Sequence, residues 1–431
     1  MKILLIYPSP DGSYHNRSIL QRTFLSLMPT SQSLMILASL VPDDYNVKII
    51  DERFERINFE EDYDLIGLSC YTFNVLRGYE IADIFRKKGK TVVIGGWHAS
   101  CLPEEVKGHA DSVVIGEAEE TWPQLLKDFE ARKLKLYYKQ IRPVPPKKIP
   151  IPRRDLIYSK IRNASLMATR GCPIGCEFCS AGTMDMIRVF RPRPVEDVIK
   201  EIQTIKQKNI VFNDPSLTIH PKYSKQLFKE MSSLNKKFIC DGNINVLGKD
   251  DEFLKLASEA GCLEWEIGFE TVSQQTLNSV GKITNLVEDY KAAIKKIQDH
   301  GIGILGCFVF GFDTDTKESL RKTIAEINRI KLSKVLFNVL TPFPSTRLYQ
   351  RLEKEGRIIS KDWSKYNGRN VVFKPKNFTA EGLQAEYNDI SKNFYTTKEI
   401  IKRFLRSDRK QFNLTPLLFP SNEFFLQISY K

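Results

Sequence analysis

The sequence predicts an α/β protein with two successive domains: a doubly wound, Rossmann-like sheet, then a partial (β/α)6 barrel with a small α-rich C-terminal extension. Short runs of Ile, Leu and Val alternate with helix-like segments over roughly the first 130 residues. A proline-rich segment then interrupts the alternation, and six further strand candidates follow it. Together these patterns predict two parallel sheets joined by a linker.

The N-terminal domain is predicted to contain five buried parallel strands. They are Ile3–Tyr7, Val47–Ile50, Leu65–Leu68, Val92–Ile94 and Val113–Ile115. Between the third and fourth strands, Leu76–Lys88 has an apolar side and predicts a helix. In doubly wound sheets, ligands bind outside the carboxyl ends of the strands. The residues that follow each strand are therefore the candidate binding residues.

The prolines at 143, 145, 146, 150 and 152, interspersed with lysine and arginine, exclude a continuous helix or a central strand. We predict domains at 1–135 and 161–345, a linker at 136–160 and a C-terminal extension at 346–431. In the extension, Trp363 and Tyr366 are expected to close the mouth of the barrel or, alternatively, to be ordinary core residues.

The second domain is predicted to begin with a strand at Ser165–Thr169. The other strand candidates are Ile210–Phe212, Phe238–Asp241, Leu263–Gly268, Ile302–Phe310 and Lys334–Val339. Pro194 suits the opening of a helix, and Gly301 suits the C-terminal cap of a later one. In barrels of this kind the active groups gather at the carboxyl ends of the strands.

Directly after the first of these strands, Cys172, Cys176 and Cys179 form a Cys-x3-Cys-x2-Cys run. Gly171 and Gly175 provide the backbone freedom that a loop wrapped around a metal centre needs. Three thiols leave one coordination position open, as in reactive centres, and thiolates suit iron–sulfur clusters. The alternatives are a zinc knuckle completed by a distant ligand, or three unrelated buried cysteines.

With the aromatic Phe178 before its last cysteine, this loop resembles that of the radical S-adenosylmethionine superfamily. The resemblance implies a [4Fe–4S] cluster on Cys172, Cys176 and Cys179, with S-adenosylmethionine on the fourth iron. Reductive cleavage of S-adenosylmethionine then yields a deoxyadenosyl radical. The implied electron donor is a reduced ferredoxin or flavodoxin.

The strand ends of the barrel supply further candidate cofactor residues: Asp214, Asn243, Glu270, Gly306 and Gly311. By the same resemblance, Glu270 binds the ribose hydroxyls or the amino group of S-adenosylmethionine, and the two glycines admit the adenine close to the backbone. Asp214 stands where the family often has an acidic residue toward substrate or cobalamin. Its alternative role is to cap the N-terminus of a helix.

Two motifs of the N-terminal domain resemble the cobalamin-binding domain of one large radical S-adenosylmethionine subfamily, the class B methyltransferases. They are Gly95-Gly96-Trp97-His98-Ala99-Ser100 and Gly116-Glu117-Ala118-Glu119. Ser69, Tyr71 and Thr72, after the third strand, complete the candidate cobalamin site. The Asp-x-His-x-x-Gly run that supplies a histidine to cobalt is missing, so we expect Tyr71 and its neighbours to shield the lower face. His98 and His15 are secondary candidates for the cobalt ligand.

The methylthiotransferases also precede a radical barrel with an α/β domain, but there they carry three cysteines for a second cluster. This chain has only Cys70 and Cys101 in that domain, which disfavours the assignment.

The chain of 431 residues, 42% of them hydrophobic, has no apolar run long enough to span a bilayer. Its eight cysteines do not form a dense disulfide pattern, which favours a reducing cytoplasm. The net charge of +13 is scattered, which disfavours nucleic-acid binding. The basic amphipathic run 398–410 indicates the solvated face of a terminal helix, with peripheral membrane association as the alternative.

We therefore expect a cobalamin-dependent radical S-adenosylmethionine enzyme that methylates an unactivated carbon of a small-molecule or lipid-like substrate. The first alternative is a non-methylating relative that forms rings or carbon–carbon bonds in tetrapyrrole or lipid biosynthesis. The second is a basic RNA- or membrane-binding protein with a structural metal knuckle. The residues do not identify the substrate.

Overall fold

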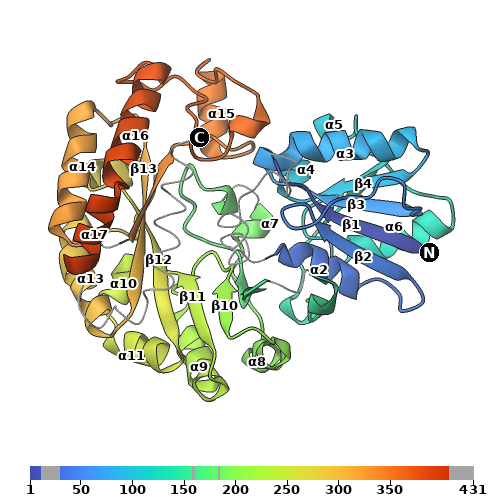
Figure 1. The fold of residues 1–431 in the computed structure, drawn as a ribbon, viewed down its shortest axis with the longest axis horizontal. Helices are drawn as coiled ribbons and strands as arrows, with labels where there is room; N and C mark the ends of the chain where they lie inside the picture. Colours follow the sequence, from blue (N-terminus) through green and yellow to red (C-terminus); the bar gives the residue numbers. More distant parts are fainter. Residues whose placement is uncertain (11–29, 158–160, 183–184, 333, 407–431) are drawn as a thin grey trace. The chain divides into compact units, whose positions relative to one another are not determined.

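The computed structural model describes residues 1–10, 30–157, 161–182, 185–332 and 334–406. They form two compact units, shown in Figure 1. The first unit is Met1–Ser165 together with Asp362–Asn367, and the second is Leu166–Lys361 together with the chain from Gly368 onward. No helix of the described residues is both long enough and apolar enough to cross a membrane.

The first unit is built on a six-stranded parallel sheet, which contains the five predicted strands and one further strand, β6. Its strands are β1 (Lys2–Tyr7), β2 (Asn46–Asp51), β3 (Leu65–Ser69), β4 (Thr91–Gly95), β5 (Ser112–Ile115) and β6 (Tyr137–Lys139). They lie in the order β2-β1-β3-β4-β5-β6, with every pair parallel. The order reverses between β1 and β3, which is where doubly wound sheets bind ligands.

Helices cover this sheet because its central strands are apolar on both faces. The helices are α2 (Gln32–Ser39), α3 (Val75–Lys87), α4 (Trp97–Cys101), α5 (Pro103–Val106) and α6 (Thr121–Glu130), with 3-10 turns η1 (Thr72–Asn74), η2 (Pro146–Lys148) and η3 (Arg154–Leu156). One core cluster joins Leu34 and Met35 of α2 and Trp122 of α6 to Ile3 and Leu5 of β1. Figure 1 shows α3 and α5 on the opposite face.

The segment expected as a linker, 136–160, contributes to the first unit instead. Tyr137–Lys139 forms β6 and pairs with Val113–Ile115 of β5. Farther along, the Arg153 N–H donates to the Met35 carbonyl (3.1 Å). A three-residue edge strand beside several prolines has too little periodicity to be recognised in the sequence.

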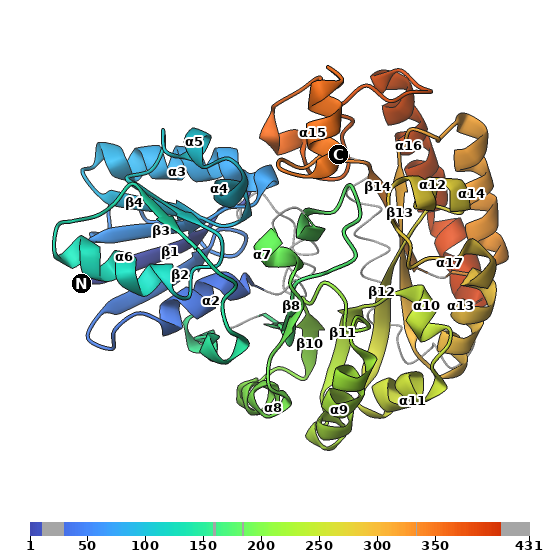
Figure 2. The same ribbon diagram turned by 180° about the vertical axis from the view of Figure 1, so that it is seen from behind.

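The second unit contains the six predicted strands of the partial barrel, visible in Figure 2. They are β7 (Asn163–Leu166), β10 (Asn209–Phe212), β11 (Lys237–Asp241), β12 (Cys262–Glu270), β13 (Gly303–Phe310) and β14 (Lys334–Val339), in the order β14-β13-β12-β11-β10-β7. The pairs from β10 through β14 are parallel. Beyond β7, a two-residue strand β8 (Thr169–Arg170) pairs antiparallel with β9 (Arg191–Pro192) and leads into the cysteine loop.

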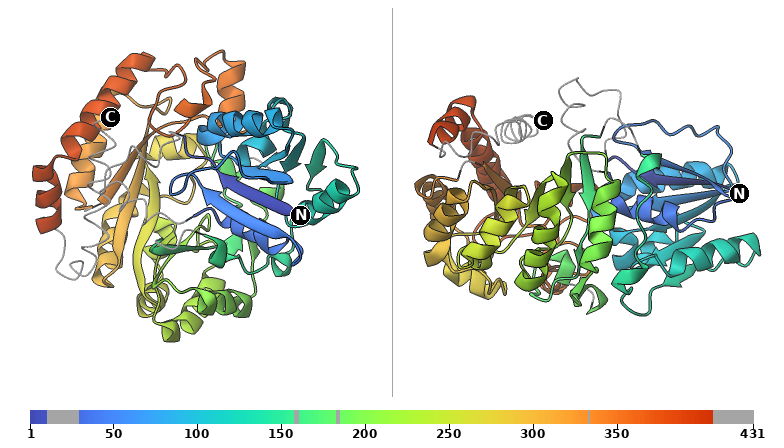
Figure 3. Two further views of the ribbon diagram at one scale, coloured as in Figure 1. Left: turned by 45° about the vertical axis from the view of Figure 1, so that its right-hand side comes forward. Right: turned by 90° about the horizontal axis from the view of Figure 1, so that it is seen from below.

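The longer helices that follow the strands lie along the outside of this sheet (Figure 3). The helices of this unit before the extension are α7 (Asp185–Arg188), α8 (Val195–Thr204), α9 (Pro221–Met231), α10 (Ile244–Leu247), α11 (Asp251–Glu259), α12 (Gln274–Ser279), α13 (Tyr290–Asp299) and α14 (Lys317–Arg329), with turns η4 (Ser180–Gly182), η5 (Ser232–Leu234) and η6 (Val287–Asp289). The longer ones bury one apolar side; α11, for example, buries Phe253, Leu254 and Ala257.

The C-terminal extension contains α15 (Arg347–Lys354), α16 (Ala380–Phe394) and α17 (Thr397–Arg406). Between α15 and α16, the 3-10 turn η7 (Trp363–Lys365) belongs to the first unit. Trp363 and Tyr366 are 5% and 0% exposed, which confirms the alternative that they are ordinary core residues. Their aromatic character correctly indicated burial, but not the domain that buries them.

Candidate functional site

The cysteine loop begins where β8 ends. Cys176 is buried, and Cys172 and Cys179 are half-buried. Both loop glycines have left-handed backbone angles, with φ of 87° at Gly171 and 71° at Gly175. A Cβ at Gly171 would collide with the Val189 carbonyl group. Only glycine fits there, so packing against residue 189 fixes the entry of the loop.

The three thiols share one electrostatic environment. The pKa of Cys176 is raised to about 11, chiefly by burial; Lys282 lowers it, and the charges of Cys179, Glu270 and Cys172 raise it. Burial also raises the pKa of Cys179. The backbone of Ala181 and the charge of Lys282 lower this pKa, whereas the charges of Cys172 and Glu270 raise it. Without a bound cation, the thiols of Cys176 and Cys179 stay protonated at neutral pH, so a bound cation must stabilise their thiolates.

In the described parts of the chain, no three His, Cys, Asp or Glu side chains surround a single point closely enough to hold one metal ion. In a four-iron cluster each thiolate binds a different iron, so the three sulfurs need not converge on one point. The donor chemistry of the loop therefore fits a cluster. Cys172, Cys176 and Cys179 remain its predicted ligands.

Asp214 holds the strand that leads into the loop. Its carboxylate accepts hydrogen bonds from the Ala168 N–H (3.0 Å), the Thr169 N–H and the Thr169 hydroxyl (2.6 Å). These bonds bend the backbone after β7, so the strand predicted to run through Thr169 ends at Leu166. Burial raises the pKa of Asp214 to about 6. The helix-cap role is wrong, because His220 caps α9; a role toward cofactor or substrate remains a prediction.

Glu270, the residue predicted to bind S-adenosylmethionine, forms a buried ion pair with Lys282. The distance from Lys282 Nζ to Glu270 Oε1 is 3.0 Å. Glu270 has a φ of 64°, a strained angle for a non-glycine residue. The Asn285 side chain donates to the Gly268 carbonyl (2.9 Å) beside it. Sequence analysis missed Lys282, although a lysine 12 residues after the glutamate, just beyond Gly281, was a usable signal.

The pair lies close to the cysteine loop. Lys282 and Glu270 both influence the pKa of Cys176, which requires proximity. The charge of Glu270 raises the pKa of Lys282 against the effect of burial, and the two thiols add to it. Beside the cysteine loop, the Lys282 ammonium can bind a carboxylate, and the Glu270 carboxylate can bind an amine or hydroxyl groups. An amino-acid portion such as that of S-adenosylmethionine presents these groups.

The other predicted barrel residues differ in their surroundings. Asn243 donates from its side chain to the Ser216 hydroxyl (3.2 Å) and from its backbone to the Thr218 hydroxyl (2.8 Å). A Cβ at Gly306 would lie 2.9 Å from Leu332 and 3.3 Å from Phe269. Residues of β13 alternate between the barrel interior and the face that the helices cover. Gly306 lies on the helix-covered face, where close packing requires a glycine. The expectation that it admits adenine there is wrong.

Gly311, at the end of β13, has a φ of 112° and donates its N–H to the buried Asp315 carboxylate (2.9 Å). A Cβ there would lie 2.8 Å from Leu383 of α16, so protein again fills the space beside the glycine. Cys307 is the residue of β13 that lies opposite Gly306 in the alternation, and its thiol donates to Glu266 Oε1 (3.4 Å). Cys307 and Glu266 are therefore neighbours that the sequence did not reveal.

In the first unit, the predicted cobalamin residues follow β3, β4 and β5 at one edge of the sheet. Tyr71 is 48% exposed and its ring stacks on Phe73, with 5.9 Å between ring centroids. The Ser69 hydroxyl lies 3.3 Å from that of Ser33, and Thr72 is buried. Tyr71 and Phe73 thus present an aromatic surface at the edge where a flat ring is expected to bind.

The two glycine motifs are shaped by the protein around them. Gly96 has a φ of 93°, and a Cβ there would lie 2.7 Å from the Cys70 carbonyl oxygen. Gly95 faces Val114, and Gly116 faces the Gln140 side chain. Glu117 accepts hydrogen bonds from the Gln140 amide (3.1 Å) and the Val144 N–H (3.0 Å). Packing of the loops thus accounts for the glycines at positions 96 and 116. Of the other residues in these two motifs, Trp97 is half-buried and Glu119 is buried.

His98 is fully buried, which argues against its role as a free cobalt ligand. Its Nε2 lies 3.3 Å from Glu105 Oε1, an atom that also accepts from the Tyr79 hydroxyl (2.9 Å) and the Trp363 indole N–H (2.8 Å). We call these four residues the Glu105 hub. Through it, a segment more than 250 residues later in the chain becomes part of the first unit. His15 lies outside the described residues.

Each of the two units matches a known protein family. Residues 26–126 match the B12 binding domain, 166–327 the radical SAM superfamily, and 346–415 a domain of unknown function (DUF4070). The chain is 34% identical over 411 residues to the bacteriochlorophyllide d C-8(2)-methyltransferase of Chlorobaculum tepidum, covering 89% of each. It is 30% identical over 387 residues to the C-12(1)-methyltransferase of that organism, covering 86% of this chain and 84% of the relative.

Among solved structures, the chain resembles the cobalamin-dependent S-adenosylmethionine radical enzyme OxsB with aqua-cobalamin and S-adenosylmethionine bound. The TM-score is 0.71 at 17% identity, over 99% of this chain and 74% of OxsB. At this identity the likeness concerns the fold, and it extends over both units.

Proposed function

Because the chain belongs to the cobalamin-dependent radical S-adenosylmethionine methyltransferase family, whose cofactors are a [4Fe–4S] cluster, S-adenosylmethionine and cobalamin, we propose that it methylates an unactivated carbon. When bound, these cofactors supply hydrogen abstraction from carbon and a transferable methyl group. The observation that carries the proposal is the cysteine loop beside the buried Lys282–Glu270 pair.

The residues of the chain serve to bind and orient the cofactors. We propose that the thiols of Cys172, Cys176 and Cys179 hold the cluster, and that Lys282 and Glu270 bind the carboxylate and the amine or ribose of S-adenosylmethionine. Burial of both charges strengthens their interactions with a polar ligand, because little water competes. In the first unit, the exposed Tyr71 ring offers one face to cobalamin.

For the substrate, we propose a large planar tetrapyrrole of the chlorin type, on the basis of the two bacteriochlorophyllide methyltransferases that the chain resembles. Ile283, directly after Lys282, has a side chain that is 75% exposed. An exposed apolar residue beside the cofactor pair supports an apolar substrate surface.

A small acidic carrier, a reduced ferredoxin or flavodoxin, is the proposed electron donor, since the chain carries a net charge of +13. The eight cysteines of the sequence do not form a dense disulfide pattern, which supports a reducing compartment, the cytoplasm. Part of the basic helix α17 packs within the protein, which disfavours peripheral membrane association. In α17, Ile400 is buried, and the Arg403 guanidinium lies 3.7 Å from the centre of the Phe394 ring.

The test is anaerobic reconstitution with cobalamin, S-adenosylmethionine, reductant and a chlorin substrate. Methyl transfer consumes one S-adenosylmethionine to S-adenosylhomocysteine and one to deoxyadenosine, so equal amounts of both products are expected. Deoxyadenosine without S-adenosylhomocysteine would favour the non-methylating alternative. The Cys176→Ala variant should release no deoxyadenosine, whereas Cys262→Ala, a buried cysteine outside the loop, should behave like the wild type. Unchanged deoxyadenosine release from Cys176→Ala would refute the ligand role.

A further inference from the structure

The C-terminal extension contacts the cysteine loop through its first helix, α15. The Leu348 N–H donates to the Glu177 carbonyl (3.1 Å), and the Arg347 guanidinium donates to the Gly175 carbonyl. From the other side, the Glu177 N–H donates to the Val280 carbonyl (2.9 Å). The backbone between Cys176 and Cys179 is thus held by residues far away in the sequence.

The Glu177 side chain makes the strongest of these contacts. Arg351 of α15 approaches it with one edge of its guanidinium: Nε lies 2.6 Å from Oε1, and Nη2 lies 3.3 Å from Oε2. This two-point geometry fixes the carboxylate more firmly than a single contact would. Glu177 is 19% exposed and Arg351 is 34% exposed, so water screens the pair only in part.

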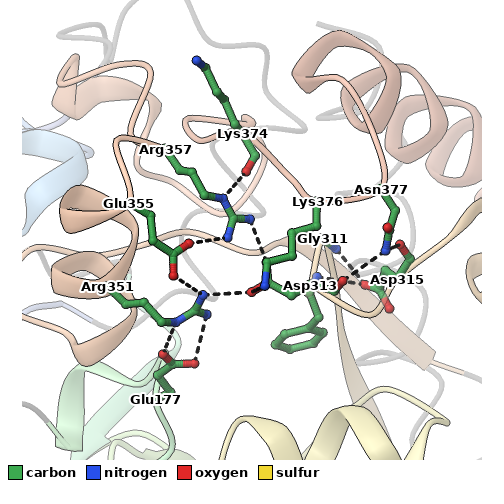
Figure 4. Close-up of polar contacts among 11 residues, drawn as sticks. Glu177, Gly311, Asp313, Asp315, Arg351, Glu355, Arg357, Lys374, Lys376 and Asn377 are labelled. Atoms are coloured by element: carbon green, nitrogen blue, oxygen red, sulfur yellow. Dashed lines mark hydrogen bonds and ion pairs between the residues drawn. The ribbon is translucent and has the colours of Figure 1, made fainter.

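Arg351 is itself held in place by a charge network, shown in Figure 4. It donates to Asp313 (2.8 Å), in the loop that follows β13. Arg357 donates to the same Asp313 carboxylate (2.7 Å) and to Glu355 (2.8 Å), while Lys376 lies 3.3 Å from Asp313. The network contains three cations and three carboxylates, so its charges balance.

An apolar layer accompanies the charges. Phe178, the aromatic residue of the cysteine motif, packs against a cluster that includes Phe312, Leu348, Leu352 and Phe373. Its ring meets that of Phe312 edge to face, with 5.8 Å between centroids. Glu177 and Phe178 therefore both point toward the extension, which explains why one is charged and the other aromatic between two cysteines.

We propose that α15 is a clamp for the cluster-binding loop and that Arg351 is a positioning residue for the cluster. The clamp fixes the spacing of Cys176 and Cys179, and Arg351 balances the Glu177 charge beside the cluster. This gives a role to the first part of the region that matches a domain of unknown function. The proposal rests on the ligand role proposed for the three cysteines.

The test compares Arg351→Ala, Arg351→Lys and Glu177→Gln in the full chain. A matched control is Arg329→Ala, which breaks an Arg–Glu pair with Glu326 (2.5 Å) on α14. Hydrogen exchange of the cluster-free protein reports the clamp itself. In Arg351→Ala the amides of Glu177 and Leu348 should exchange about tenfold faster, because the contacts that hold the loop are lost. In Arg329→Ala they should not change.

After reconstitution, the midpoint potential of the cluster is measured by electron paramagnetic resonance. In Arg351→Ala the uncompensated Glu177 charge disfavours the reduced cluster, so the potential should fall. In Glu177→Gln it should rise, and in Arg351→Lys it should stay near that of the wild type. The lysine should restore only part of the exchange protection, because an ammonium lacks the planar fork of a guanidinium.

Wild-type exchange and potential in both Arg351→Ala and Glu177→Gln would overturn the proposal. Glu177→Gln preserves side-chain size, so it keeps the test decisive if Arg351→Ala does not fold. The exchange result needs no cluster. Failure of the cysteine assignment would instead appear as full iron content in Cys176→Ala, and the two failures are therefore distinguishable.

Discussion

The Lys282 ammonium lies 3.0 Å from Glu270 Oε1, with the two side chains only 14% and 9% exposed. A Cβ at Gly268 would fall 3.1 Å from Lys282 Nζ and even closer to the Glu270 carboxylate. The pair thus occupies the space that the glycine leaves free. Both charges act on the pKa of Cys176, which Lys282 lowers and Glu270 raises.

Lys282→Met should destabilise the protein by about 3 kcal/mol and weaken S-adenosylmethionine binding at least about tenfold, because it leaves Glu270 buried without a counter-charge. Denaturant unfolding and equilibrium dialysis measure the two effects. The double variant Lys282→Met/Glu270→Gln should recover most of the stability but not the binding. Equal stability of the single and double variants would show that the pair does not matter for folding.

Gly171→Ala should prevent cluster assembly, whereas Gly281→Ala should not. Both glycines have positive φ, 87° and 71°. A Cβ at Gly171 collides with the Val189 carbonyl, but one at Gly281 has no neighbour closer than 3.8 Å. Gly281→Ala should therefore cost only about 1 kcal/mol of backbone strain. Iron content after reconstitution and thermal unfolding separate the two, and equal iron content would argue against the packing constraint at Gly171.

The Glu105 hub should anchor the turn Trp363–Lys365 to the first unit. Trp363→Phe removes the N–H donor and one of the two fused rings but keeps an aromatic side chain, so it should cost at least about 1 kcal/mol. Glu105→Ala leaves the buried His98, Tyr79 and Trp363 donors without this acceptor and should cost about 2 kcal/mol. Proteolysis around residues 361–368 should accelerate in the same order. Protease resistance equal to the wild type in Glu105→Ala would contradict the anchor.

Asp315 should make stability depend on pH. Burial raises its pKa to about 6, against its hydrogen bonds from the Gly311 and Phe312 N–H groups. A raised pKa means that the folded state binds the proton more tightly than the unfolded state. The contribution is full below about pH 4 and is lost as the pH rises through about 6.

Asp315→Asn retains an oxygen acceptor but cannot titrate, so it serves as the matched reference. Between pH 4 and pH 7, the unfolding free energy of the wild type should fall relative to this variant by about 2 to 3 kcal/mol. Urea unfolding at several pH values measures the difference. A difference that stays constant with pH would show that Asp315 is ionised throughout this range.

Local patterns revealed the sheets and the cysteine loop because both are short-range signals. The runs Ile3–Tyr7 and Lys334–Val339 are buried strands, and their apolar character follows directly from that burial. β6 was missed because it has three residues at an edge. Gly306 was placed on the wrong side of its strand because a shift of one residue exchanges the two faces.

By itself, the sequence determined the two α/β units, the three-cysteine loop and the glutamate at the end of β12, since each follows from residues adjacent in the chain. Only the tertiary structure decided their partners: Lys282 for Glu270, Arg351 for Glu177, and Trp363 for the Glu105 hub. These partners lie 12, 174 and 258 residues apart in the chain. The lysine 12 residues after Glu270 lies close enough in the chain to have been a usable signal. The other two partners come together only when whole elements pack, so no local pattern records them.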